Sequence, residues 1–147
     1  KEAQTYIDNY LEKYSGIKEY MNKTINGAKE TGFVETLFGR RRYINELKSS
    51  NYMVREFGKR AAMNTPIQGT AADIMKKAIN TVYERLKKSG IDAKIILQVH
   101  DELILEVKEE QKEEAKKILK ESMENATKLE VPLLVETSEA KSWYDAK

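Results

Sequence analysis

KIILQVHDELILEV, which spans Lys94 to Val107, is the most informative segment of the 147-residue sequence. Its two halves, KIILQV and LILEV, are rich in β-branched and other apolar residues, and only His100, Asp101 and Glu102 separate them. Two such runs joined by a short polar segment are typical of a tight β-hairpin. The segment therefore predicts two antiparallel strands that carry one histidine and two carboxylates at their turn.

Regular elements are expected on both sides of this hairpin. Thr70 and Asp73 have the spacing of a capping box, and helical periodicity continues from there to a stop at Ser89. After the hairpin, a charged helix is expected over 109–128 and an edge strand over 131–135. The order helix, strand, strand, helix, strand is that of a ferredoxin-like unit without its first strand. We predict an α+β fold, an incomplete ferredoxin-like antiparallel sheet with helices on one face.

The first part of the chain predicts helices and a ribbon. Two antiparallel helices are expected before residue 31, with a break at Gly16, and a hairpin over Phe33–Ile44 that turns at Gly39. A helix over Asn51–Asn64 should end or kink at Pro66, because proline lacks an N–H group and disfavours the α region in the preceding residue. The following aromatic residues are interpreted as core residues: Tyr6, Tyr10, Tyr14, Tyr20, Trp143 and Tyr144.

The composition excludes several classes of protein. Apolar residues make up 40% of the chain and charged residues 34%, and no run approaches the ~20 uncharged residues of a membrane span. The absence of cysteine excludes disulfides and thiolate zinc sites, and a single histidine disfavours a zinc enzyme. The chain starts inside a helical pattern without Met or a targeting segment, which suggests a piece of a longer protein.

The net charge of +2 hides an asymmetry along the chain. Residues 31–60 sum to +4, residues 61–90 to +3, and residues 91–147 to −5. A basic middle segment favours a polyanionic partner, whereas the acidic end is either a solvated face or a place where cations collect.

The turn of the central hairpin has two interpretations. Adjacent carboxylates at Asp101 and Glu102 repel each other, and a magnesium ion would offset that cost because it binds oxygen ligands from one or two carboxylates. Alternatively, Asp101 is only a good turn residue and Glu102 a solvated neighbour. The tripeptide alone does not decide between the two.

Two basic or amide-bearing groups could bind nucleic acid. Arg60, Asn64 and Gln68 are four residues apart, so they share a helix face if Pro66 leaves the helix intact. As donors they could contact the minor-groove acceptors that every base pair presents, although a simple polar face fits equally well. Arg40, Arg41 and Arg42 form a basic run that suits phosphate binding, with a solvated loop as the alternative. The local charge of +4 favours the phosphate interpretation.

Three segments together resemble one family: GFVETLFGRRRYI, RAAMNTPIQGTAADI and QVHDELILEV. They are similar to the C-terminal part of family A DNA polymerases of the bacterial DNA polymerase I type, and the resemblance runs essentially end to end. It implies a right-hand fold with residues 1–60 on the fingers side and residues 61–147 in the palm. Asn45 departs from the proline that relatives commonly have there, which affects only the local loop.

The resemblance also implies roles for the candidate residues. Asp101 matches the second metal-binding aspartate of the family, Glu102 its less critical neighbour, and His100 a residue near the primer terminus. The trio of Arg60, Asn64 and Gln68 matches residues that contact the primer–template minor groove and the terminal pair.

The implied activity is magnesium-dependent, template-directed nucleotidyl transfer to a primer 3′ hydroxyl in DNA replication and repair, in the bacterial cytoplasm. The implied partners are primer–template DNA, deoxynucleoside triphosphates and the remainder of the polymerase chain; no membrane is involved. The first catalytic aspartate and the nucleotide-binding fingers helix have no match here, so the isolated chain is expected to be inactive. The alternatives are a stand-alone nucleic-acid-binding module without catalysis and a purely structural interaction domain.

Overall fold

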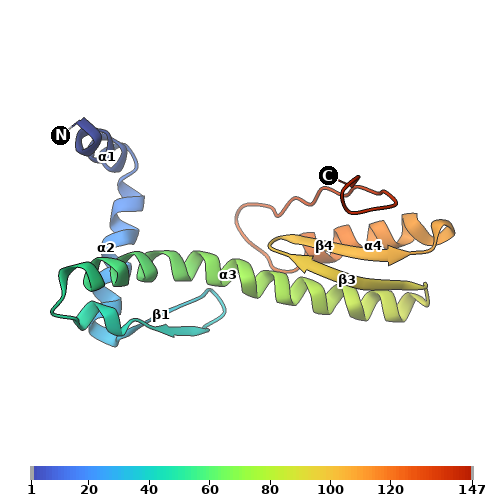
Figure 1. Cartoon of the computed structure of the whole chain (residues 1–147), viewed down its shortest axis with the longest axis horizontal. Helices are drawn as coiled ribbons and strands as arrows, with labels where there is room; N and C mark the ends of the chain where they lie inside the picture. The colour runs from blue at the N-terminus through green and yellow to red at the C-terminus, as the bar shows by residue number, and fades with distance from the viewer. Residues whose placement is uncertain (1, 147) are drawn as a thin grey trace. The chain divides into compact units, whose positions relative to one another are not determined.

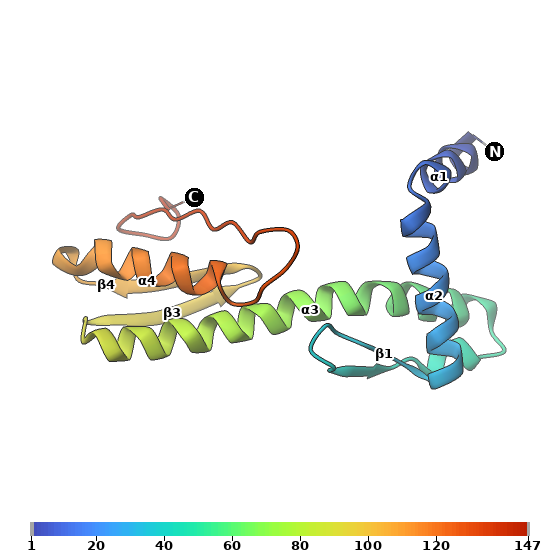
Figure 2. The ribbon, with the colours of Figure 1, turned by 180° about the vertical axis from the view of Figure 1, so that it is seen from behind.

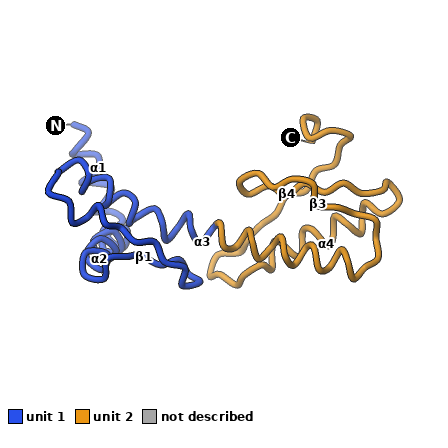
Figure 3. Tube along the Cα trace, turned by 60° about the horizontal axis from the view of Figure 1, so that its bottom comes forward, with its two compact units in different colours: residues 1–71 blue, residues 72–147 orange. Residues whose placement is uncertain are grey.

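The computed structural model describes residues 2–146, which form two compact units that divide between Ala71 and Ala72 (Figure 3). The predicted α+β class is confirmed. The elements follow in chain order (Figure 1): α1 (Glu2–Lys13), α2 (Ser15–Thr31), β1 (Phe33–Glu35), β2 (Arg41–Tyr43), the 3-10 turn η1 (Asn45–Lys48), α3 (Tyr52–Ser89), β3 (Ala93–Val99), β4 (Glu102–Val107), the 3-10 turn η2 (Glu109–Gln111) and α4 (Lys112–Glu124). The units are defined by contacts within the chain, whereas the expected boundary at residue 60 separates a fingers side from a palm, so the two boundaries need not coincide.

The first two helices differ from the prediction. They exist as expected, but Figures 1 and 2 show α1 and α2 meeting at a bend rather than packing antiparallel. None of the described residues of α1 is buried, and Tyr6 is 70% exposed. The assignment of Tyr6, Tyr10, Tyr14 and Tyr20 to the core was therefore wrong, because all four side chains are exposed.

The hairpin expected over Phe33–Ile44 is confirmed. Strands β1 and β2 pair antiparallel, with Phe33 opposite Tyr43, and Gly39 adopts the positive φ of 79° that the turn requires. The core of unit 1 lies where this hairpin, α2, η1 and α3 meet, and its buried residues are Ala28, Val34, Ile44, Leu47 and Ala62.

Helix α3 is continuous through Pro66, so the predicted end near Asn64 and the capping box at Thr70 were both wrong. Proline fixes φ near the helical value and removes only one donor, so a helix can pass through it where packing compensates. Here Thr65 is buried against the hairpin, and the Thr70 hydroxyl donates to the Pro66 carbonyl instead of capping a new helix. Tertiary packing outweighs the local signal. The predicted stop is confirmed, because α3 ends at Ser89 and Gly90 follows with a φ of 73°.

Unit 2 packs the second half of α3 and helix α4 against the hairpin of β3 and β4. These two strands pair antiparallel as predicted, with Val99 opposite Glu102 and Ala93 opposite Val107. The buried core consists of Met75, Val82, Leu86, Leu103 and Ile118. Helix α4 is shorter than expected, since its first turn is the 3-10 segment η2.

The strand expected over 131–135 is not formed, because no neighbouring strand pairs with it in the described part of the chain. Pro132 cannot donate, and the amide of Val135 donates instead to Glu124 Oε1 at 3.2 Å. Trp143 is 42% and Tyr144 88% exposed, so placing them in the core was also wrong. No described helix has the length and apolar character needed to cross a bilayer.

Candidate metal and nucleic-acid sites

Three donor side chains lie on one exposed face of α3. Because the helix continues through Pro66, Arg60, Asn64 and Gln68 keep their spacing of four residues, and all three side chains are exposed. The face that the sequence predicted is therefore present in unit 1. An arginine and two amides at this spacing can donate several hydrogen bonds to acceptors arranged along a groove.

Each of the three hairpin arginines has a partner within unit 1. Arg40 Nη2 donates to the Gly69 carbonyl at 3.0 Å, and Arg42 Nη1 donates to Thr65 Oγ1 at 3.1 Å. Arg41 Nε donates to Glu35 Oε1 at 2.7 Å, which raises the pKa of Arg41, and its guanidinium lies 4.5 Å from the centre of the Phe33 ring. The basic run is thus more than a solvated loop, because Arg40 and Arg42 tie the hairpin to α3.

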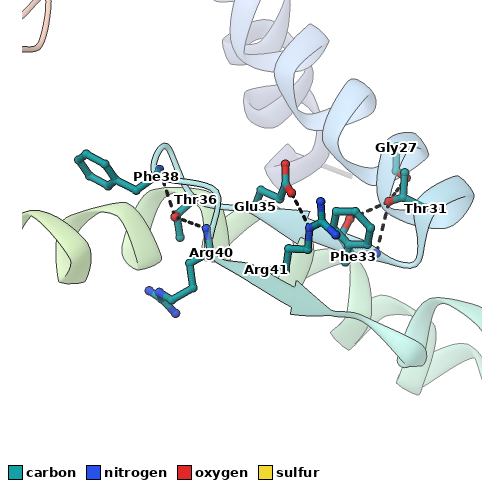
Figure 4. A network of polar contacts seen from close by, with 8 residues as sticks. All are labelled: Gly27, Thr31, Phe33, Glu35, Thr36, Phe38, Arg40 and Arg41. Atoms are coloured by element: carbon teal, nitrogen blue, oxygen red, sulfur yellow. Dashed lines mark hydrogen bonds and ion pairs between the residues drawn. The ribbon is translucent and has the colours of Figure 1, made fainter.

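A threonine closes the loop between β1 and β2, which contains Arg40 (Figure 4). Thr36 is only 5% exposed, and its hydroxyl accepts hydrogen bonds from the amides of Phe38 and Arg40 at 3.3 and 3.1 Å. At the other end of the hairpin, the Thr31 hydroxyl donates to the carbonyls of Gly27 and Phe33. The hairpin is therefore held at both of its ends by side-chain hydrogen bonds.

Sequence reasoning missed the residues that hold the hairpin on α3, namely Thr36, Thr65, Gly69 and Thr70. The backbone amide of Leu37 donates to Thr70 Oγ1 at 2.9 Å. One signal was available in the sequence, since a glycine inside a helical pattern usually has a packing reason. Gly69 is such a residue.

The turn between β3 and β4 contains His100 and Asp101, and Glu102 is the first residue of β4. His100 has a φ of 51°, the one positive value of a residue other than glycine in the described range. Its carbonyl accepts a hydrogen bond from Gln98 Nε2 at 2.7 Å. All three turn residues are exposed, so the turn presents its imidazole and two carboxylates to solvent.

The carboxylates at this turn fit part of a magnesium site. Asp101 and Glu102 offer carboxylate oxygens, and Trp143 Nε1 donates to Glu102 Oε2 at 3.3 Å. Magnesium in proteins is usually held by one or two carboxylates, with substrate phosphates and water completing its shell. Within residues 2–146, no three His, Asp or Glu side chains are grouped so that they could hold a metal. Unit 2 thus carries the candidate metal ligands and His100, and unit 1 carries the other candidate DNA contacts.

Comparison with solved structures identifies the class of protein to which the fold belongs. The chain superposes with a TM-score of 0.94 and 43% identity on the POL domain of Pol1 from M. smegmatis, solved in complex with DNA primer-template and dNTP, covering 99% of this chain and 26% of that one. The fold is therefore that of part of a polymerase domain.

Sequence comparison gives the family. The family model for DNA polymerase family A matches residues 1–145. The DNA polymerases I of Caldicellulosiruptor bescii and Bacillus subtilis (strain 168) are each 51% identical to the chain over 147 residues. The chain belongs to DNA polymerase family A. It spans 17% of the length of these two relatives.

Proposed function

We propose that the chain is part of a DNA-directed DNA polymerase, a nucleotidyltransferase that extends a primer 3′ hydroxyl along a template in DNA replication and repair. This proposal rests on the close similarity of the chain to a polymerase domain solved with DNA primer-template and dNTP. Primer–template DNA and deoxynucleoside triphosphates are the partners of the proposed activity. Because the relatives are bacterial, we place the enzyme in the bacterial cytoplasm.

Asp101 is the proposed magnesium ligand of this chain, with Glu102 beside it in a secondary role. A magnesium ion held there would supply activation of the primer 3′ hydroxyl and charge stabilisation of the departing pyrophosphate. Asp101 is exposed at the turn, so its carboxylate is accessible to a metal ion from solvent. The hydrogen bond from Trp143 restrains the Glu102 carboxylate, and the neighbouring His100 is proposed to contact the primer terminus.

Unit 1 is proposed to bind the duplex. Arg60, Asn64 and Gln68 donate to the minor-groove acceptors N3 of purines and O2 of pyrimidines, which are present at every base pair. Donors at these positions test pairing geometry without reading sequence, as an enzyme that copies any template requires. The hairpin arginines, Arg40 to Arg42, supply positive charge to the phosphate backbone.

The remainder of the polymerase is the proposed partner of the chain's exposed apolar residues. Tyr6 and Tyr10 on α1, and Val131 and Leu134 in the last segment, are large and exposed. Two-metal nucleotidyl transfer needs more carboxylate ligands than Asp101 alone, so we infer that another part of the polymerase supplies them. The 147-residue chain by itself should therefore show no template-directed activity.

Primer extension tests this function. The intact polymerase that carries this chain should extend a radiolabelled primer only with a template, the complementary deoxynucleotide and magnesium, whereas the isolated chain should not extend it. Extension by the isolated chain, purified free of other polymerases, would contradict the inferred division of ligands. Failure of the intact protein to extend, together with salt-dependent DNA binding, would favour a non-catalytic nucleic-acid-binding module.

A further inference from the structure

Helix α3 and the β1–β2 hairpin approach each other closely at Gly69. A Cβ atom added to this residue would lie 2.7 Å from Thr36 Cγ2 and 3.3 Å from Arg40 Nη2. The first distance is shorter than carbon atoms tolerate, and Thr36 is buried, so it cannot simply turn away. The absence of a side chain at position 69 therefore sets how closely the hairpin approaches the helix.

Polar contacts surround this point and join the same two elements. Arg40 donates to the Gly69 carbonyl at 3.0 Å, and the Leu37 amide donates to Thr70 Oγ1 at 2.9 Å. One helical turn earlier, Arg42 donates to Thr65 Oγ1 at 3.1 Å. The hairpin is thus fastened to α3 from residue 65 to residue 70.

This fastened stretch of α3 contains a proline. Pro66 has no N–H group to complete the helical ladder. The hydroxyls of Thr65 and Thr70 donate back to the carbonyls of Ala61 and Pro66, at 2.7 and 2.5 Å. Proline and threonines bonded in this way favour helix bending, so the direction of the helix here depends on what packs against it.

The proposed DNA-contacting face extends across the same stretch. Arg60 and Asn64 precede Pro66, whereas Gln68 follows it. With 3.6 residues per turn, Gly69 lies roughly 140° around the helix from the middle of that face. A change in bend at Pro66 would therefore displace Gln68 relative to the other two side chains without touching any of them.

We propose that Thr36 and Gly69 are positioning residues, whose contact sets the direction in which α3 continues through Pro66 and so aligns Gln68 with Arg60 and Asn64. This inference rests on the proposed function of that face. Thr36 and Gly69 would then affect discrimination between matched and mismatched terminal base pairs without contacting DNA. The simple alternative is that their contact only stabilises unit 1.

Four variants of the intact polymerase separate these possibilities. Gly69→Ala introduces the clash with the Thr36 methyl group. Thr36→Ser removes that methyl but keeps the hydroxyl that accepts from Phe38 and Arg40. The double variant combines both changes, and Gly27→Ala is the matched control, because a Cβ at that helical glycine meets nothing within 4 Å.

The readout is steady-state primer extension from matched and mismatched 3′ termini, at a temperature where circular dichroism shows every variant to be folded. Gly69→Ala should lower kcat/KM on matched termini by about 10- to 100-fold and reduce discrimination against mismatches, because small misplacements carry costs of this size. In the double variant, Thr36→Ser should restore most of the kcat/KM that Gly69→Ala removes. Gly27→Ala should stay near wild type, whereas Thr36→Ser alone should lose less than Gly69→Ala, because it removes the methyl contact but keeps the hydroxyl that closes the loop.

A further variant covers the case in which Gly69→Ala does not fold. Thr70→Ala removes the acceptor of the Leu37 amide without adding an atom, and should lower extension about two- to tenfold with the same loss of discrimination. Normal extension and discrimination in the folded variants would overturn the proposal, as would a defect that Thr36→Ser does not relieve. Absence of extension in the wild-type enzyme would instead reject the proposed function.

Discussion

The guanidinium of Arg42 donates from Nη1 to Thr65 Oγ1 over 3.1 Å, and so ties β2 to α3 one residue before Pro66. Its neighbour in the chain, Arg41, turns instead to the Glu35 carboxylate within the hairpin. Two consecutive arginines therefore differ in their electrostatic surroundings. Arg42 meets an uncharged hydroxyl, whereas the charge of Arg41 is offset by a carboxylate.

This difference predicts unequal contributions to DNA binding. Removal of one phosphate-binding cation should reduce the log–log dependence of affinity on salt by about 0.9. Arg42→Gln in the intact polymerase should reduce the slope by about this amount. Arg41→Gln should change it less, because Glu35 already offsets that charge. Fluorescence anisotropy titrations across a salt series measure the slope, and equal effects at the two positions would contradict this prediction.

The turn at His100 predicts separate effects on stability and activity. With φ at 51°, His100→Val should lower the free energy of unfolding by about 1–2 kcal/mol, because the left-handed region is costly for a β-branched residue. His100→Gly should be neutral or raise it by up to about 1 kcal/mol. Both should weaken primer extension, since both remove the imidazole.

Urea denaturation of the chain and extension by the intact enzyme check these two effects. Equal stability of the glycine and valine variants would show that the backbone conformation at His100 is not costly. Full activity of the stable glycine variant would remove His100 from the primer site.

The ion pair between Arg85 and Glu121 predicts a pH dependence of stability in unit 2. Arg85 Nη2 lies 2.6 Å from Glu121 Oε2, and this hydrogen bond lowers the pKa of Glu121 below its usual 4.5. A carboxylate with a depressed pKa stabilises the fold above its unfolded-state pKa, and this stabilisation is lost as the pH falls through the folded-state value.

Thermal melts between pH 7 and pH 3 measure this contribution. Glu121→Gln should have a lower Tm than wild type at pH 7. Below pH 4.5, the Tm of the variant should fall less than the Tm of wild type. Glu114→Gln, an exposed position on the same helix, is the control and should follow wild type. Identical pH profiles for wild type and Glu121→Gln would show that the pair contributes nothing.

Local patterns predicted the elements that depend on local chemistry. The two hairpins and the helix stop at Gly90 were predicted correctly, because alternating apolar residues and glycines at turns act within a few residues. The shared face of Arg60, Asn64 and Gln68 was predicted on the condition that Pro66 leaves the helix intact, and the helix is intact there.

The errors concern features that distant residues decide. Pro66 and Thr70 carry local signals for a helix boundary, but packing of the hairpin keeps α3 continuous. The segment over 131–135 has the composition of a strand yet lacks a partner strand in the described chain. The tyrosines of α1 have helical spacing, but apolar spacing alone does not say which element will cover them. The contact between Thr36 and Gly69 could not be predicted either, because it joins residues that are distant in the sequence.

Replacement of Asp101 by asparagine in the intact polymerase tests the central proposal most directly. Asparagine keeps the size of the side chain and removes the charge that would hold magnesium, so kcat for primer extension should fall at least about a thousandfold. The Kd for primer–template DNA should stay within about threefold, because the proposed minor-groove and phosphate contacts lie in unit 1 and the His100 side chain is unchanged. Glu106→Gln, an exposed carboxylate on the same hairpin, should leave both quantities near wild type. Near-normal turnover by Asp101→Asn would contradict the metal-binding role of this turn.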